Sequence, residues 1–193
     1  MTDPPDLPTR AFASSAAWER WLERSHASAP GIWLKFAKKE SGVASVSRSD
    51  AIDMALCFGW IDGQVAPLDE RFWLTRFTPR RPRSRWSQRN RDRATALIAD
   101  GRMRPAGLEE VERAQGDGRW DAAYPGQASA AVPEDLAQAL AATPCAAEYF
   151  ATLDRVNRYA ILYRLHDAKR PATRAARLER FIQMLARHEK IHP

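Results

Sequence analysis

The chain lacks any long uninterrupted apolar segment. Hydrophobic residues make up 45% of its 193 positions, yet no run approaches the ~20 residues that a membrane-spanning helix needs. The first ten residues, MTDPPDLPTR, contain neither the basic start nor the apolar stretch of a signal peptide. We therefore expect a cytoplasmic protein without a membrane span.

Cysteine and histidine are scarce. Cys57 and Cys145 are the only cysteines, and both lie in apolar helical contexts, which disfavours a disulfide framework and favours a reducing compartment. Cys57 is interpreted as a core thiol rather than a nucleophile. Of the four histidines, His188 and His192 alone are four residues apart, and a terminal pair of this kind is more often solvated than metal-bound. The sequence predicts no metal site and no cofactor.

Signature motifs of the common enzyme classes are missing as well. There is no P-loop, no GxGxxG dinucleotide fingerprint and no GxSxG nucleophile elbow. These absences favour a protein that is not an enzyme, with an enzyme of unknown reaction kept as an alternative.

Charge, in contrast, is abundant and unevenly distributed. The net charge is +6, but residues 71–104 carry 11 basic and two acidic side chains, whereas residues 105–154 carry two basic and nine acidic ones. Blocks of this kind mark charged surfaces. The acidic block can also fold against the basic one, which would neutralise both.

The most basic stretch is FTPRRPRSRWSQRNRDR, residues 77–93, with a single acid, Asp92. Arginine binds phosphate and carboxylate through two parallel hydrogen bonds and stays charged. Trp86 lies among the arginines and suits stacking on a nucleic-acid base. If Ser87 caps the following helix, the free N–H groups there add an anion site. The stretch therefore predicts either an anion pocket or a nucleic-acid surface.

Backbone geometry limits which arginines can meet. In an extended segment Arg81, Arg83 and Arg85 lie on one side, because strand side chains alternate. In the following helix Arg89 and Arg93 share a face. The arginines expected to converge on one ligand are Arg76, Arg81, Arg83 and Arg89.

The segment GWIDG, residues 59–63, is the second candidate. Gly59 and Gly63 tolerate positive φ, and Asp62 can close a tight turn with its own carboxylate. Trp60 either packs inward or lines a pocket with Asp62 beside the arginine-bearing strand. Asp62 can equally pair with one of those arginines, which would keep it ionised.

A third cluster precedes and opens the last expected helix. Its members are Lys169, Arg170, Arg174 and Arg177. Cations at a helix N-terminus oppose the helix dipole, so they call for an anion or for acidic neighbours. A solvated helix face is the simpler interpretation. Arg170 and Arg174 are kept as ligand-binding candidates.

Hydrophobic periodicity predicts the α+β class, with a small N-terminal strand-helix-strand unit packed with a mostly α-helical C-terminal bundle. The expected strands are 32–36 and 71–77, with a helix capped by Ser47 between them and an earlier helix capped by Ser14 or Ser15. The chain after Ser87 is helical, and Pro133, Pro144 and Pro171 are expected in the first turns of three of its helices. The expected organisation is a disordered tail (1–10), an α+β unit that includes the basic segment (11–115), a linker (116–132) and a helical region (133–193).

Several motifs resemble one known family. They are CFGWIDG (Cys57–Gly63), RFTPRRPRSRWSQRN (Arg76–Asn90), GRM (Gly101–Met103), AGL (Ala106–Leu108) and AKRPATRAARLERFIQMLA (Ala168–Ala186). Together they are similar to the YdeI/OmpD-associated, or bacteriocin-protection, family, whose OmdA-type region corresponds to the C-terminal motif. The resemblance covers nearly the whole chain from about Trp18. It implies a link to tolerance of antimicrobial peptides or bacteriocins and no particular reaction, cofactor or catalytic residue.

The sequence thus predicts a cytoplasmic bacterial stress-tolerance protein that binds a phosphate- or carboxylate-bearing ligand in an arginine-lined pocket. The alternatives are a nucleic-acid-binding module using residues 76–93 and an enzyme of unknown reaction. The candidate ligand-binding residues are Trp60, Asp62, Arg76, Arg81, Arg83, Trp86, Arg89, Arg170 and Arg174.

Overall fold

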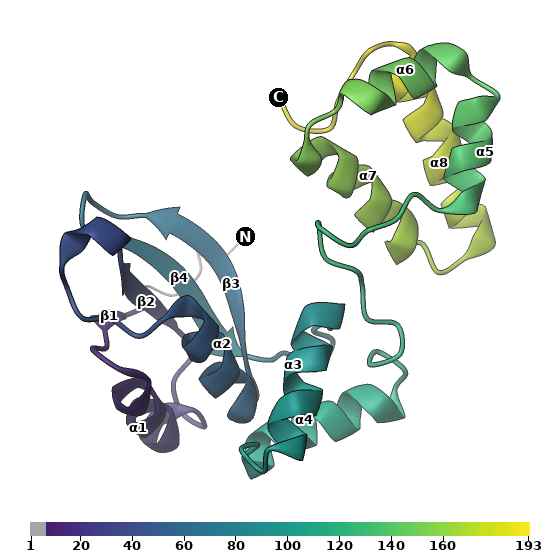
Figure 1. Ribbon diagram of the computed structural model, residues 1–193. Coiled ribbons are helices and arrows are strands. Elements are labelled where there is room, and N and C mark those ends of the chain that lie inside the picture. The colour runs from purple at the N-terminus through teal and green to yellow at the C-terminus, as the bar shows by residue number, and fades with distance from the viewer. Residues whose placement is uncertain (1–6) are drawn as a thin grey trace. The chain divides into compact units, whose positions relative to one another are not determined.

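The structure is a computed structural model that describes residues 7–193. The chain divides into two compact units, each of which is described by itself. Unit 1 comprises the described residues up to Trp86 together with Asn90–Ala123, and unit 2 comprises Ser87–Arg89 and Tyr124–Pro193. A sheet forms in the N-terminal part and most helices follow it (Figure 1), which confirms the predicted α+β class.

Unit 1 is built on a four-stranded sheet in the order β1-β2-β4-β3. The strands are β1 (Thr9–Ala11), β2 (Ile32–Ala37), β3 (Trp60–Pro67) and β4 (Phe72–Pro79). β1 runs parallel to β2, and the other two pairings are antiparallel. Both predicted strands are present. Residues 1–6 of the predicted tail lie outside the described residues, while Thr9 and Arg10 belong to β1 and so differ from that prediction.

The segment around Gly59 folds differently from the tight turn that the sequence predicts. Gly59, at φ 72°, follows α2 (Arg48–Cys57), and strand β3 begins at the next residue. Asp62 lies inside this strand, opposite Phe77 of β4. The tight turn comes later, where the Asp69 carboxylate accepts hydrogen bonds from the backbone N–H groups of Arg71 and Phe72, both at 2.8 Å. One glycine with positive φ is enough to leave the helix.

Two helices cover one face of the sheet, α1 (Ser15–Ser25) and α2. Both start as predicted with a serine cap: the side chains of Ser14 and Ser47 accept hydrogen bonds from Ala17 and Asp50 N–H. Trp18 of α1 is fully buried against the sheet, and its ring packs edge-on to Phe77 at 5.7 Å. The covered face is lined by alternate residues of β2, namely Ile32, Leu34 and Phe36.

The rest of unit 1 is helical. It contains α3 (Gln88–Ala99), whose first two residues cluster with unit 2, and α4 (Pro105–Gly116). Arg93 of α3 ties this helix to α2 by an ion pair with Asp53 and a 3.0 Å hydrogen bond to Ser49. Helix α4 packs on α2. Of the predicted linker residues 116–132, Gly116 ends α4, and the others lie between α4 and the first helix of unit 2.

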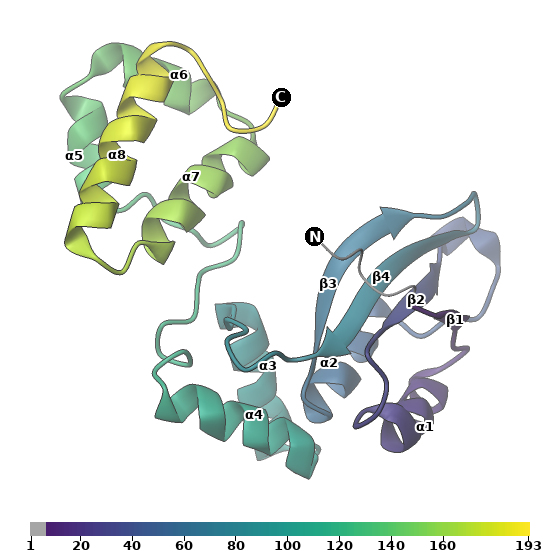
Figure 2. The same ribbon diagram turned by 180° about the vertical axis from the view of Figure 1, so that it is seen from behind.

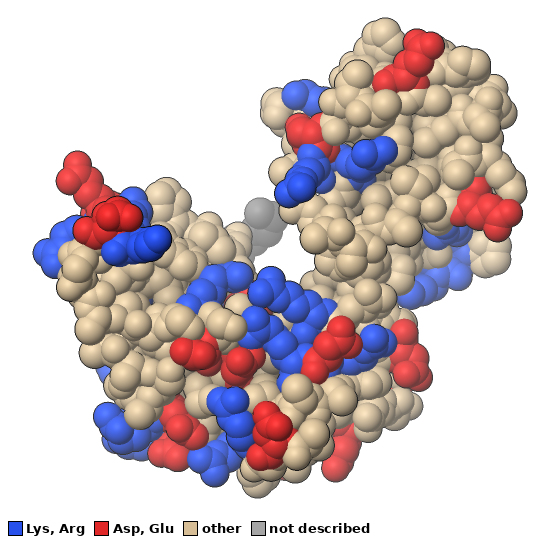
Figure 3. Space-filling model, in the orientation of Figure 1, with Lys and Arg blue, Asp and Glu red and all other residues tan. Residues whose placement is uncertain are grey.

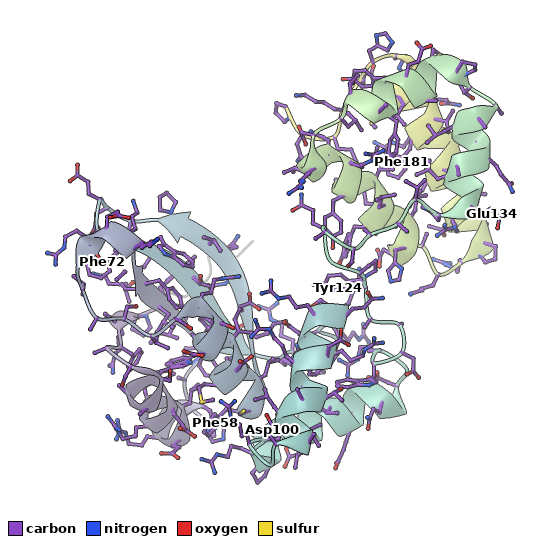
Figure 4. The ribbon with its side chains drawn as sticks, viewed as in Figure 1. Phe58, Phe72, Asp100, Tyr124, Glu134 and Phe181 are labelled. Atoms are coloured by element: carbon purple, nitrogen blue, oxygen red, sulfur yellow. The ribbon has the colours of Figure 1, made fainter. Side chains whose placement is uncertain are left out.

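Unit 2 is a bundle of four helices. They are α5 (Glu134–Ala141), α6 (Pro144–Thr152), α7 (Arg155–Asp167) and α8 (Pro171–Ala186). Pro144 and Pro171 occupy the first helical turn, as the sequence predicts. The bundle has its own core, in which Phe181 of α8 points among the other helices (Figure 4). In residues 7–193, no helix combines the length and apolarity needed to cross a membrane.

Candidate functional site

The basic segment is anchored by a buried arginine. Arg80 is 5% exposed, its guanidinium lies 3.6 Å from the centre of the Trp86 ring, and its Nη1 donates to the Arg85 carbonyl. Trp86 is 1% exposed and packs edge-on against Trp120 at 4.9 Å. This corrects the expectation that Trp86 stacks on a nucleic-acid base, because its ring is already enclosed by protein. Tryptophan and arginine form a structural pair here.

The residues between Arg80 and Trp86 form a turn and not an extended strand. Ser84 N–H donates to the Arg81 carbonyl at 2.8 Å, and Arg81 N–H donates to Ser84 Oγ at 3.0 Å. The alternation that would place Arg81, Arg83 and Arg85 on one side is therefore absent. Arg81 and Arg83 are exposed on this turn.

Other arginines of the segment hold unit 1 together or remain exposed. Arg93 pairs with Asp53, and Arg91 pairs with Asp92 at 3.3 Å. Arg89 is exposed in the first turn of α3. Lys and Arg side chains gather around α3 in the view of Figure 3. The exposure of Arg81, Arg83 and Arg89 leaves the nucleic-acid prediction for residues 76–93 in place but does not favour an enclosed pocket built from these arginines.

The GWIDG candidates lie in different surroundings. Trp60 is 1% exposed and donates from Nε1 to the His26 carbonyl at 3.1 Å, so it is a core residue and cannot line an open pocket. Asp62 pairs with Arg48 of α2 at 2.9 Å. Asp62 therefore has an arginine partner, but this partner comes from α2 and is not one of the arginines of residues 76–93 that the sequence predicted. Arg76 lies on β4, half-buried.

The two ligand-binding candidates near the start of α8, Arg170 and Arg174, also lie in different surroundings. Arg174 forms two hydrogen bonds with Asp135 of α5, at 2.6 and 2.8 Å, and a third with the Leu165 carbonyl. This binds α5, α7 and α8 together and leaves little of the guanidinium for a ligand. Arg170, the residue that precedes α8, is exposed. The cations at this helix start are therefore compensated in part by an internal acid, one of the two outcomes that the sequence left open.

The Arg174–Asp135 pair makes a testable contribution to acid stability. Arg174 hydrogen bonds hold the pKa of Asp135 below its ordinary value, so the pair stabilises the fold above about pH 4 and loses its effect as the pH falls. Because Asp135 is 37% exposed, we expect about 1 kcal/mol or less at neutral pH. The measurement is urea unfolding of Arg174→Gln and the unaltered protein between pH 7 and pH 2. Their difference in unfolding free energy should shrink at acid pH, and a difference that grows there would contradict the assignment.

Cys57 behaves as a structural thiol. It is 1% exposed, and burial raises the pKa of its thiol to about 11. The thiolate needed for nucleophilic attack is therefore scarce at neutral pH. Within residues 7–193, no three His, Cys, Asp or Glu side chains come together in an arrangement that could hold a metal ion.

A cationic cavity lies in unit 2, where the sequence analysis considered only one of its residues. It has a volume of about 690 Å³ and is formed by α7, α8 and the residues that follow α8. Its basic residues are Arg164, Arg177, Arg180, Arg187 and Lys190, and its acidic residues are Asp167 and Glu189. The remaining lining is apolar, from Phe181, Met184 and Ile191. We call this site the α7–α8 pocket.

Internal contacts fix three of the pocket arginines. Arg177 donates to the Arg164 carbonyl and lies 3.5 Å from Asp167, while Arg164 donates to the Ala160 carbonyl at 3.2 Å. Arg187 and Glu189 pair at 3.0 Å, which raises the pKa of Arg187 and lowers that of Glu189. These contacts hold part of the cationic lining in place before any ligand arrives.

Two further cations of the pocket are free. Arg180 and Lys190 are exposed and have no hydrogen bond or ion pair within residues 7–193. One signal in the sequence could have revealed the site. Arg177, Arg180, Met184 and Arg187 follow helical spacing and therefore share one stripe of α8.

Two family models match the chain. Residues 10–110, slightly more than half of it, match the family described as Domain of unknown function (DUF8412). Residues 129–188 match the family described as Bacteriocin-protection, YdeI or OmpD-Associated, abbreviated OmdA. The chain belongs to the DUF8412 family and carries an OmdA domain. No curated protein and no solved structure gives a significant match.

The OmdA match confirms the resemblance found in the sequence and locates it in unit 2. The C-terminal motif, Ala168–Ala186, lies inside residues 129–188, whereas Cys57–Gly63 and Arg76–Asn90 lie inside the segment matched by DUF8412. Seven of the ten residues that line the α7–α8 pocket lie within the OmdA match, and Glu189, Lys190 and Ile191 follow it. The match gives residues 129–188 the description of a bacteriocin-protection, YdeI-type domain, and this description names no biochemical activity.

Proposed function

We propose that unit 2, which contains the OmdA match, binds an anionic ligand with an apolar portion in the α7–α8 pocket. The observation that carries this proposal is the composition of one cavity: five cations and two carboxylates line about 690 Å³ of space. Arginine is suited to carboxylate and phosphate groups because its guanidinium is planar and always charged. The volume falls in the range of small-molecule sites.

The apolar lining narrows the ligand class. Phe181, Met184 and Ile191 offer hydrophobic surface beside the cations, and burying apolar ligand area there contributes about 25 cal/mol per Å². A small inorganic anion would leave this surface uncovered, whereas a neutral lipid would leave the cations unused. An amphiphilic phosphate or carboxylate satisfies both parts of the pocket.

We also infer the biological role and the cellular location of this binding. Binding of such a ligand would be the biochemical step behind the bacteriocin protection that the OmdA description names. A cytoplasmic location fits the two free cysteines, because Cys145 is exposed and an exposed thiol persists in a reducing compartment.

The test uses octyl phosphate as the probe, below its micelle-forming concentration, with isothermal titration calorimetry on the full chain. We expect the double variant Arg180→Glu/Lys190→Glu to bind octyl phosphate about tenfold more weakly than the unaltered protein. The variant removes two attractive charges and adds two repulsive ones. Inorganic phosphate and octanol should each bind more weakly than octyl phosphate. Phosphate can contact only the cations of the pocket, and octanol gains only from its apolar lining.

The matched control is Lys169→Glu/Arg170→Glu. It changes the net charge by the same amount with exposed residues outside the pocket lining. We expect its affinity for octyl phosphate to fall less than that of the pocket variant, because Lys169 and Arg170 are exposed and do not line the pocket. Equal losses in both double variants would mean that general charge, and not the pocket, determines binding.

A further inference from the structure

The sheet of unit 1 has a second face that α1 and α2 do not cover. Opposite residues in antiparallel strands point the same way, so the register of β2 with β4 places three pairs on this face: Trp33 with Arg76, Lys35 with Leu74, and Ala37 with Phe72. Their neighbours Ile32, Leu34 and Phe36 point to the covered face. Figure 2 views the sheet from this side, with β3 and β4 toward the viewer. We call this surface the open face.

Two aromatic rings on the open face are only partly buried. Trp33 and Phe72 are half-buried and lie outside the core cluster of unit 1. Phe72 is found at the far end of the sheet in Figure 4. The two residues are about 13 Å apart along the strands, since Arg76, the partner of Trp33, lies four residues from Phe72 at ~3.3 Å each. The rings are thus separate platforms on one surface.

The residues beside these rings have small side chains, which project little from the sheet. Thr9 and Ala11 of β1 lie beside Trp33 and Lys35. On the other side, the Arg76 guanidinium lies over Gly63 of β3, and a Cβ at position 63 would come within 3.6 Å of its Nε. A Cβ at position 63 would therefore be in van der Waals contact with the Arg76 side chain. The open face is therefore accessible to a flat group that stacks on the rings.

The charge of the open face is positive. The Lys35 ammonium lies 5.4 Å from the centre of the Phe72 ring, and the Arg71 guanidinium lies 5.8 Å from it. Arg76 has no hydrogen bond or ion pair within residues 7–193, and its Nε is buried without an acceptor. The open-face positions of β1, β2 and β4 contain no acid. Asp62 of β3 points to the other face, where it binds Arg48.

We propose that the open face binds single-stranded nucleic acid. Trp33 and Phe72 stack on two bases. The Lys35 and Arg71 side chains, which lie over the Phe72 ring, move aside for the base, and Arg76 and Lys35 contact the phosphates. Alternating rings and cations are the two elements that non-specific single-strand binding requires. A duplex keeps its bases stacked on one another and cannot use the rings. An apolar partner would cover the Lys35 and Arg76 cations without offering them an anion, which costs free energy.

The experiment is fluorescence anisotropy with the full chain and labelled oligothymidylate or oligouridylate of about 20 nucleotides at low salt. Replacing both rings, Trp33→Leu/Phe72→Leu, keeps apolar volume but removes the stacking surfaces. We expect affinity to fall at least fivefold and up to about 150-fold for each base that loses its ring. Arg76→Gln should lower the slope of log K against log salt by about 0.7. A duplex of the same length should bind more weakly than the single strand.

The control variant is Arg81→Gln/Arg83→Gln, on the exposed turn outside the sheet. We expect it to lower the salt slope without removing the preference for single strands. The proposal is overturned if no binding occurs at low salt, if the leucine variant binds as tightly as the unaltered protein, or if duplex and single strand bind equally. Circular dichroism confirms that the leucine variant is folded, and Trp33→Phe, which retains a ring, should keep most of the affinity of the unaltered protein.

The comparison of DNA with RNA probes identifies the groups that are recognised. Equal affinities indicate that the protein contacts phosphates and bases, whereas a preference for RNA indicates contacts to the 2′-hydroxyl.

Discussion

Gly107→Ala is expected to destabilise unit 1, although alanine is the better helix former. Gly107 lies inside α4, where it meets the last turn of α2. A Cβ there would come within 2.4 Å of the Cys57 carbonyl oxygen and 2.7 Å of the Leu56 carbonyl oxygen. These are backbone atoms that cannot rotate away, so the two helices would have to separate. Overpacking of this kind costs about 1–3 kcal/mol or more, which exceeds the gain of up to about 1 kcal/mol from helix propensity.

The matched control lies on the same helix. Gly116→Ala makes the identical change at a position where the added Cβ meets no heavy atom within 4 Å. We expect it to leave the unfolding free energy unchanged or to raise it by up to about 1 kcal/mol. Urea unfolding followed by tryptophan fluorescence measures both variants. Stabilisation by both substitutions would contradict the close approach of α4 to α2.

Trp18→Ala is expected to cost unit 1 about 3–5 kcal/mol of unfolding free energy. Trp18 is fully buried, stacks on Trp21 at 5.2 Å and donates from Nε1 to the Ala51 carbonyl at 3.1 Å. The substitution leaves a cavity between α1 and the sheet and also leaves a buried carbonyl without its donor. The loss is a large part of the 5–15 kcal/mol that stabilises most domains.

Trp33→Ala provides the comparison for this effect. Trp33 is half-buried on the open face and lies outside the core cluster, so its removal should cost less than about 2 kcal/mol. Thermal unfolding monitored by circular dichroism distinguishes the two tryptophans. If Trp33→Ala were as destabilising as Trp18→Ala, the open face would be part of the core and could not receive a ligand.

The features that the sequence predicted correctly depend on neighbouring residues. Ser14 and Ser47 cap helices because a serine side chain reaches the N–H groups of the next turn. Pro144 and Pro171 start helices because their fixed φ suits the first turn. The strand at residues 32–36 follows from alternation of buried and half-buried side chains. Each of these signals lies within a few residues of its effect.

The features that the sequence did not reveal depend on distant residues. Thr9–Ala11 is a strand because β2, more than 20 residues later, supplies its hydrogen bonds. Trp86 is buried because Arg80 and Trp120 enclose it. Neither contact can be read from local composition, and an arginine-rich segment with a tryptophan looks the same whether the ring is enclosed or free.

The cavity in unit 2 is not the arginine pocket that the sequence predicted. An arginine-lined cavity exists, but α7, α8 and the residues after α8 form it, and Arg177 is its one member among the residues considered beforehand. The arginines of the most basic stretch instead hold unit 1 together or lie exposed. The prediction relied on the local density of arginines in residues 77–93. The cavity instead arises from the packing of two helices, and its cations are spread over more than 20 positions of the sequence.

The most direct test of the account is to locate the ligand in the α7–α8 pocket. Nuclear magnetic resonance of the ¹⁵N-labelled full chain, titrated with octyl phosphate, follows backbone amides and arginine Nε–Hε groups together. We predict saturable shifts concentrated in residues 164–191, with the Arg164, Arg177 and Arg180 side chains among the most affected. Shifts that stay in unit 1, or that spread evenly over all exposed arginines, would contradict the assignment of anion binding to the OmdA domain.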